Sequence, residues 1–171
     1  MDKRWIYILI ILALALISGY FVVMESPKVG SAITNVNTSL VTLPADFEVS
    51  SKNSKSVTMG DGKIGEKIYL EDLGKKHVAF EKYNEILEDS AESDEVDNLR
   101  NSTNTTSQSI TFYLISYENM TSDMNISKAY FEKNNHTFYI KLSNYTNVTS
   151  HDSDLKFLID NLSPDYKKGR N

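Results

Sequence analysis

The sequence predicts an α+β domain. We expect an antiparallel sheet of about five to six strands in the order β-β-β-α-loop-β-β-β-α, with the helices on one face and one transmembrane helix in front. Three observations lead to this fold class: short alternating segments rich in β-branched and aromatic residues, two segments with apolar residues at helical spacing, and one charge-free N-terminal run. An antiparallel sheet covered by helices buries such a mixture well.

The N-terminal run covers residues 5–24, WIYILIILALALISGYFVVM, and contains no charged residue. Twenty helical residues span roughly 30 Å, the thickness of the hydrocarbon core of a bilayer. The alternative is a cleavable signal peptide, but its apolar region is usually shorter and ends in small residues, whereas this run ends in bulky ones. We therefore predict an uncleaved transmembrane signal anchor at 5–24, after a cytoplasmic stub at 1–4.

The flanking charges predict the orientation of this segment. Lys3 and Arg4 precede the run, and positive charge beside a membrane segment stays cytoplasmic. Ala15 and Gly19 form a small-xxx-small pair that would allow a weak homodimer. After residue 24 the chain has 16 basic and 22 acidic residues, a net charge of −6, which disfavours nucleic acid as a partner. The predicted location is the cell membrane, single-pass, with the N-terminus inside and the bulk of the chain extracytoplasmic.

Asn-x-Ser/Thr triplets, the acceptors for N-linked glycan, are unusually frequent. Nine of the fifteen asparagines begin one, where the Ser and Thr content predicts about three by chance. All nine follow the apolar run, although a composition rich in Asn, Ser and Thr could also produce triplets passively. The triplet at Asn161 precedes Pro164 at an expected helix end, and we do not count it among the glycosylation candidates. The glycosylation candidates are Asn37, Asn101, Asn104, Asn119, Asn125, Asn135, Asn144 and Asn147.

The first half of the outer part predicts a spacer and then short strands. Residues 25–42 contain Pro27, Gly30 and small polar residues, and we expect a spacer there. The folded domain is expected over 43–163, with a loose tail at 164–171. Its first strands are predicted from the alternation of Phe47 and Val49 and from SVTM and KIYLE, with a glycine-containing turn at GDGK between the last two.

A helix and an acidic segment are predicted next. Ala79, Phe80, Tyr83, Ile86 and Leu87 fall at helical spacing and form one apolar stripe. Residues 89–109 lack apolar periodicity, and we expect a mobile acidic and Ser/Thr/Asn-rich loop. A solvated loop is the preferred interpretation of the acidic run, because it lacks the glycine and spacing of a calcium loop. The weak calcium candidates are Glu88, Asp89, Glu92, Asp94, Glu95 and Asp97.

The second half begins with a strand, ITFYLISY, and a hairpin. Residues 128–133 and 136–142 are predicted to pair around Asn134 and Asn135, because asparagine tolerates the positive φ of a two-residue turn. The tyrosines of these strands are expected to cover the second face of the sheet.

A last helix carries apolar residues at positions 155, 158, 159 and 162. Asp152 or Ser153 is expected to be its N-cap, and Pro164 to end it.

These segments resemble a known type of protein. LPADFEV, SVTMGDGK, IYLEDLG, AYFEKNNHTFYI and LKFLIDNL are similar to segments of small membrane-anchored surface proteins of unknown function from methanogenic archaea. Their outer module is similar to the PsbP/Mog1-type α+β sandwich, and the resemblance covers about residues 43–162. It rests on the hairpin and the terminal helix, and the acidic loop departs from it. The resemblance implies an accessory or binding module without a catalytic activity.

No catalytic or metal-binding motif is recognisable. His77, His136 and His151 have no second His or Cys at metal-ligand spacing, and His136 and His151 are expected at the surface. We therefore predict no enzymatic activity and no cofactor. The predicted function is that of a membrane-anchored, N-glycosylated surface or envelope interaction module with unidentified partners. The alternative is an extracytoplasmic receptor domain for a small ligand or a cation such as calcium.

Overall fold

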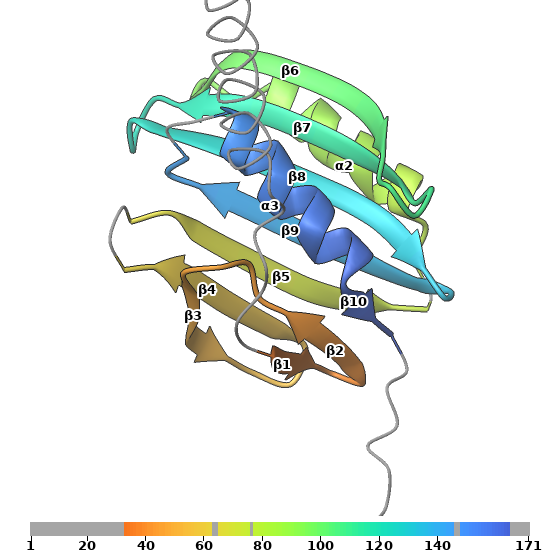
Figure 1. Cartoon of the computed structure of the whole chain (residues 1–171). Coiled ribbons are helices and arrows are strands. Elements are labelled where there is room, and N and C mark those ends of the chain that lie inside the picture. The colour runs from red at the N-terminus through yellow and green to blue at the C-terminus, as the bar shows by residue number, and fades with distance from the viewer. Residues whose placement is uncertain (1–32, 63–64, 76, 146–147, 165–171) are drawn as a thin grey trace, which may run out of the picture.

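The computed structural model describes residues 33–62, 65–75, 77–145 and 148–164. Within them lie ten strands and two helices: β1 (Ile33–Val36), β2 (Ser39–Thr42), β3 (Phe47–Lys52), β4 (Ser56–Asp61), β5 (Lys67–Gly74), α2 (Ala79–Ala91), β6 (Val96–Thr105), β7 (Thr111–Asn119), β8 (Met124–Lys133), β9 (His136–Ser143), α3 (Val148–Asp160) and β10 (Leu162–Ser163). They form a seven-stranded sheet, β3-β4-β5-β9-β8-β7-β6, and a three-stranded sheet, β1-β2-β10 (Figure 1). The prediction of an α+β domain built on one sheet with five to six strands is therefore wrong, because the described part of the chain is mostly β and forms two sheets.

Two antiparallel meanders make up the large sheet. One contains β3, β4 and β5 and the other β6 to β9, and β5 joins them by pairing with β9, where Leu70 faces Ile140. The strands expected from SVTM, KIYLE and ITFYLISY are confirmed, and so is the hairpin of β8 and β9. Its turn residues Asn134 and Asn135 have φ of 49° and 62°, the left-handed backbone that asparagine tolerates.

The two helices lie on opposite faces of the large sheet, so the prediction that they share one face is wrong (Figure 1). On the α3 face, Phe131 and Phe138 pack in one cluster with Leu155 and with residues of the small sheet. On the α2 face, Tyr83 packs with tyrosines of β7 and β8, as expected for the second face. Strands β7 and β8 carry apolar side chains on both faces, and a different helix therefore packs against each face.

Strand β6 replaces most of the loop predicted over residues 89–109. The helix α2 continues to Ala91, and β6 pairs with β7, with a register shift between Asp97 and Arg100 and with Thr103 opposite Tyr113. No residue of β6 is buried, because it is the edge strand of the sheet and both of its faces are largely open to solvent. The strand is held by backbone hydrogen bonds to β7. Because these bonds do not depend on buried side chains, the sequence of β6 shows no apolar alternation.

The expected spacer at 25–42 is also partly wrong, because residues 33–42 form the hairpin of β1 and β2. Val36 and Val41 are fully buried in the core on the α3 face. The last helix begins at Val148, so Asp152 and Ser153 lie inside it and are not its N-cap. Asp152 accepts an ion pair from Lys156 at 3.0 Å, one helical turn later.

Neighbouring residues of β8 cap both helices. Val78 precedes α2 and supplies no side-chain cap, but the Glu132 carboxylate accepts a hydrogen bond from the Ala79 amide at 2.9 Å. Lys133, pointing to the other face, donates from Nζ to the carbonyls of Ile159 and Asp160 at 2.9 and 2.8 Å. A negative group at a helix N-terminus and a positive one at a C-terminus both match the helix dipole.

The described part of the chain contains no helix that is long and apolar enough to cross a bilayer. The anchor predicted at 5–24, with its Ala15/Gly19 pair, lies outside the described residues, as do Asn147 and most of the tail at 164–171.

Candidate functional site

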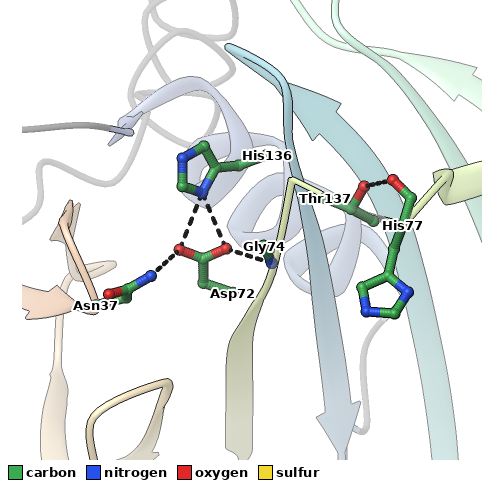
Figure 2. A network of polar contacts seen from close by, with 6 residues as sticks. All are labelled: Asn37, Asp72, Gly74, His77, His136 and Thr137. Carbon is green, nitrogen blue, oxygen red and sulfur yellow. Dashed lines mark hydrogen bonds and ion pairs between the residues drawn. The ribbon is translucent and has the colours of Figure 1, made fainter.

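A buried carboxylate and a buried histidine are in contact at the junction of the two sheets (Figure 2). The Nδ1 atom of His136 lies 3.1 Å from both carboxylate oxygens of Asp72. Asn37 donates from Nδ2 to the same carboxylate at 3.0 Å, and the Gly74 amide donates at 2.8 Å. We call these four residues the Asp72 network. Its members come from the β1–β2 turn, β5 and the first residue of β9, so it connects the small sheet to the large one.

The geometry of the Asp72 network favours a structural role. Because an ionised carboxylate only accepts hydrogen bonds, the Nδ1 of His136 carries the proton in this contact. The Asp72 side chain is completely buried and that of His136 is 5% exposed, so the dyad is shielded from solvent. A buried charge needs several donors, and these come from separate elements. The arrangement therefore fixes the position of the β1–β2 turn.

The expectation that His136 and His151 lie at the surface is wrong, since they are 4% and 8% exposed. Both positions carried a sequence signal. His136 is in phase with Phe138 and Ile140 along β9, which face the core. His151 precedes Leu155 by one helical turn, on the buried side of α3. These periodicities predict burial for both histidines, although one lies at a hairpin end and the other near a helix start. His77 is exposed.

A groove lies between β6 and the start of α3, and we call it the β6–α3 groove. Its volume is about 530 Å³. Polar side chains from the ends of β6, β7 and β8 line it, together with Tyr145 and the first described turn of α3. Its lining residues include Asn98, Arg100, Asn101, Ser102, Leu114, Ser116, Glu118, Asn125, Ser127, Tyr145, His151 and Asp152.

Hydrogen bonds already order part of this lining. The hydroxyls of Ser116 and Ser127 lie 2.8 Å apart across β7 and β8. Asn98 donates from Nδ2 to the carboxylate of Glu118 at 3.0 Å across β6 and β7. The groove therefore has a preorganised polar floor.

Two rings at the base of the groove are buried. Tyr145 and His151 meet edge to face, with centroids 5.5 Å apart. Burial lowers the pKa of His151, an effect that the Asp152 carboxylate opposes. Burial, followed by the charge of Asp154, raises the pKa of Tyr145. Both rings are therefore uncharged near neutral pH.

A second cavity of about 540 Å³ lies beside the N-terminus of α2. Phe80, whose side chain is half exposed, lines it and contacts the Tyr83 and Tyr113 rings at centroid distances of 6.1 and 5.2 Å. The helix-capping pair Glu132 and Lys133 also lines it. These two charged side chains are thus already engaged in capping the helices.

The described glycosylation candidates are all exposed or partly exposed, and none is buried. Asn101 and Asn104 lie on the edge strand β6, and the others lie at turns or strand ends. Some of their amides are already used: Asn37 belongs to the Asp72 network, and Asn144 donates to the Gly65 carbonyl at 3.1 Å. Asn101 and Asn135 have no side-chain hydrogen bond within the described residues. The described set is Asn37, Asn101, Asn104, Asn119, Asn125, Asn135 and Asn144.

The weak calcium candidates do not form a site in the structure. Glu88 and Asp89 lie on α2, Asp97 lies on β6, and Glu92, Asp94 and Glu95 lie between these elements, all of them exposed. Within the described residues, no group of three or more His, Cys, Asp or Glu side chains could hold a metal ion. The calcium alternative stays a prediction without a matching geometry.

Comparison with known proteins gives little further information. No family model matches the chain, and no curated protein matches it. A protein from Bacteroides thetaiotaomicron VPI-5482, with a crystal structure at 1.50 Å resolution, is similar with a TM-score of 0.41 and 9% sequence identity. The similarity covers 84% of this chain and 50% of the other, so the chain spans about half the length of that protein. The resemblance to archaeal surface proteins stays a prediction.

Proposed function

We propose that this protein is a membrane-anchored, N-glycosylated domain outside the cytoplasm that acts as a non-catalytic surface or envelope interaction module. The observation that carries the proposal is the placement of the glycan acceptors. A glycan is large and hydrated, and an acceptor must therefore lie on exposed chain. The described acceptors meet this requirement, since none of them is buried.

The edge strand β6 gives a second argument. An exposed edge presents unpaired backbone groups that promote pairing with other chains. Asn101 and Asn104 stand on this strand, and a glycan on either would shield it. Glycosylation would thus protect a displayed domain from edge-to-edge aggregation while other surfaces remain free for partners.

Glycopeptide mass spectrometry of the protein purified from its native cells tests the proposal. We expect glycan on Asn101 and Asn135, whose amides are free of side-chain hydrogen bonds within the described residues. Asn135→Gly removes one acceptor and suits the left-handed backbone at φ 62°. Asn134→Gly is its matched control, because Asn134 has φ 49° in the same turn but does not begin a triplet.

A second matched pair addresses β6. Thr103→Val destroys the triplet of Asn101, whereas Thr105→Val, at an exposed position on the same strand, leaves both triplets intact. We expect the glycan mass to disappear from Asn101 in the first variant only. Unmodified Asn101 and Asn135 peptides in the native protein would contradict the glycosylation part of the proposal. Protease treatment of intact cells tests its topology: survival of residues 33–164 in intact but not lysed cells would contradict the outward orientation.

A further inference from the structure

The α3 face of the large sheet changes from apolar to polar where it enters the β6–α3 groove. Along β7 the inward residues change from Leu114 to Ser116, and along β8 they change from Ala129 to Ser127. The two serines are partly or largely buried and bond to each other. If this end of the sheet face were only packed against other elements of the domain, its residues would remain apolar, as they do beneath α3. The polar floor is therefore suited to a polar occupant.

The charges that line the groove argue against an ionic occupant. The lining contains one basic residue, Arg100, and two carboxylates, Glu118 and Asp152, so it has no positive excess to hold a phosphate or sulfate. A metal ion is equally disfavoured, because the described carboxylates do not converge into a group of three. The remaining polar groups are hydroxyls and amides, and these donate and accept hydrogen bonds.

His151 supplies an independent observation. His151 lines the groove and is 8% exposed, and its Nε2, which is shielded from solvent, has no hydrogen-bond partner within the described residues. A buried polar atom without a partner is rare in folded proteins and often marks a binding or reactive position.

We propose that the β6–α3 groove binds an uncharged saccharide of one or two rings. Hydroxyls of the sugar would bond to Ser102, Ser116 and Asn125, and its apolar face would lie over Leu114. A volume of about 530 Å³ falls within the range of roughly 300–1,000 Å³ found for small-molecule sites. This binding activity is a separate proposal from the glycosylation and the membrane anchoring above, and because it is tested on the unglycosylated chain, neither result decides the other.

Saturation-transfer NMR tests the proposal. The full chain is produced without glycosylation, because Asn101 and Asn125 line the groove and a covalent glycan could occupy it. It is held in dodecylphosphocholine micelles, since a detergent with a sugar headgroup would compete. The probes are D-glucose, D-galactose, D-mannose, N-acetyl-D-glucosamine, maltose and lactose, each at about 10 mM, which detects millimolar binding.

Two variants locate the site and one controls for them. Ser102→Trp places a large ring over the groove from an exposed position of β6, and His151→Phe removes the imidazole nitrogens. Ser51→Trp is the matched control, because Ser51 is exposed on β3, the opposite edge strand of the same sheet. We expect at least one probe to bind the unmodified chain and the Ser51→Trp chain, and to bind the other two about tenfold more weakly or worse.

Other outcomes overturn the proposal. These are the absence of signal from every probe, binding that persists unchanged in folded Ser102→Trp, or binding in the groove of inorganic phosphate or calcium in place of the saccharides. If His151→Phe fails to fold, the surface variant Ser102→Trp still decides the matter.

Discussion

The two caps supplied by β8 should each contribute measurably to stability. Glu132→Ala removes the carboxylate that accepts from the Ala79 amide at 2.9 Å. The N-terminus of α2 then loses its only side-chain acceptor within the described residues, because Val78 offers none. Losing an N-cap costs about 1 kcal/mol, within a range of roughly 0.5–2 kcal/mol. We expect a decrease of about 1 kcal/mol in the free energy of unfolding.

Lys133→Met keeps the apolar stem of the side chain and removes the ammonium group that bonds to Ile159 and Asp160. Hydrogen bonds to charged groups contribute about 1.5–3 kcal/mol in proteins, and partly buried charges at helix ends up to about 2 kcal/mol. Burial disfavours the charged form and lowers the pKa of Lys133, which offsets part of this gain. We therefore expect a loss of about 1 kcal/mol, below the range given for hydrogen bonds to charged groups.

Urea unfolding and amide hydrogen exchange measure these effects. The urea midpoint should decrease in each variant with an unchanged slope. Exchange should accelerate in the first turn of α2 for Glu132→Ala and in the last turn of α3 for Lys133→Met. Because the capped helices lie on opposite faces of the sheet, the double variant should show the sum of the two losses within about 0.5 kcal/mol.

Lys67→Met, at an exposed position on β5, is the control and should change stability by less than about 0.5 kcal/mol. The reasoning would be refuted if Glu132→Ala and Lys133→Met behaved like this control. It would also be refuted if either variant accelerated exchange in both helices equally, since the caps act on one helix each.

Asp72→Ala should lower the free energy of unfolding by about 3–5 kcal/mol, because it leaves buried donors without their carboxylate; a urea midpoint equal to that of the unmodified chain would contradict this. The pKa of His151 is lowered on folding, so the unfolded state takes up a proton first as the pH falls below about 6.5. Stability should therefore decline below pH 6.5 by up to about 1.4 kcal/mol per pH unit until the folded-state pKa is passed; urea unfolding at pH 7.5 and 5.5 should show a smaller decline for His151→Phe. Gly74→Ala should cost about 1–2 kcal/mol in thermal or urea unfolding, because Gly74 has φ of +85°. Gly62→Ala, where an added Cβ meets open space, should be nearly neutral; equal effects would contradict the strain argument.

Local sequence signals predicted several elements correctly. The paired asparagines at 134 and 135 tolerate the turn backbone by themselves, and the flanking alternation continues through both strands. The apolar stripe from Ala79 to Leu87 likewise gave a helix. These predictions are correct because turn conformation and the periodicity of one buried face both depend on residues that are close together in the sequence.

The errors arose where the deciding partner lies far away in the chain. The stretch NSTNTTS, residues 101–107, has no apolar period, yet most of it is strand because β7 pairs with it. His136 is buried because Asp72, 64 positions earlier, provides the carboxylate. Neither the β6–α3 groove nor the Asp72 network could be inferred from sequence spacing, since each combines side chains from at least three elements.

The sequence by itself thus determined the hairpin, the alternating strands and the two amphipathic helices, because their conformational preferences and periodicities are local. The tertiary structure alone decided which face each helix covers and how the helix ends are capped. The adjacent residues Glu132 and Lys133 show the physical reason. Side chains alternate across a strand, so two neighbours in the sequence reach opposite faces and satisfy helix termini that are distant from them along the chain.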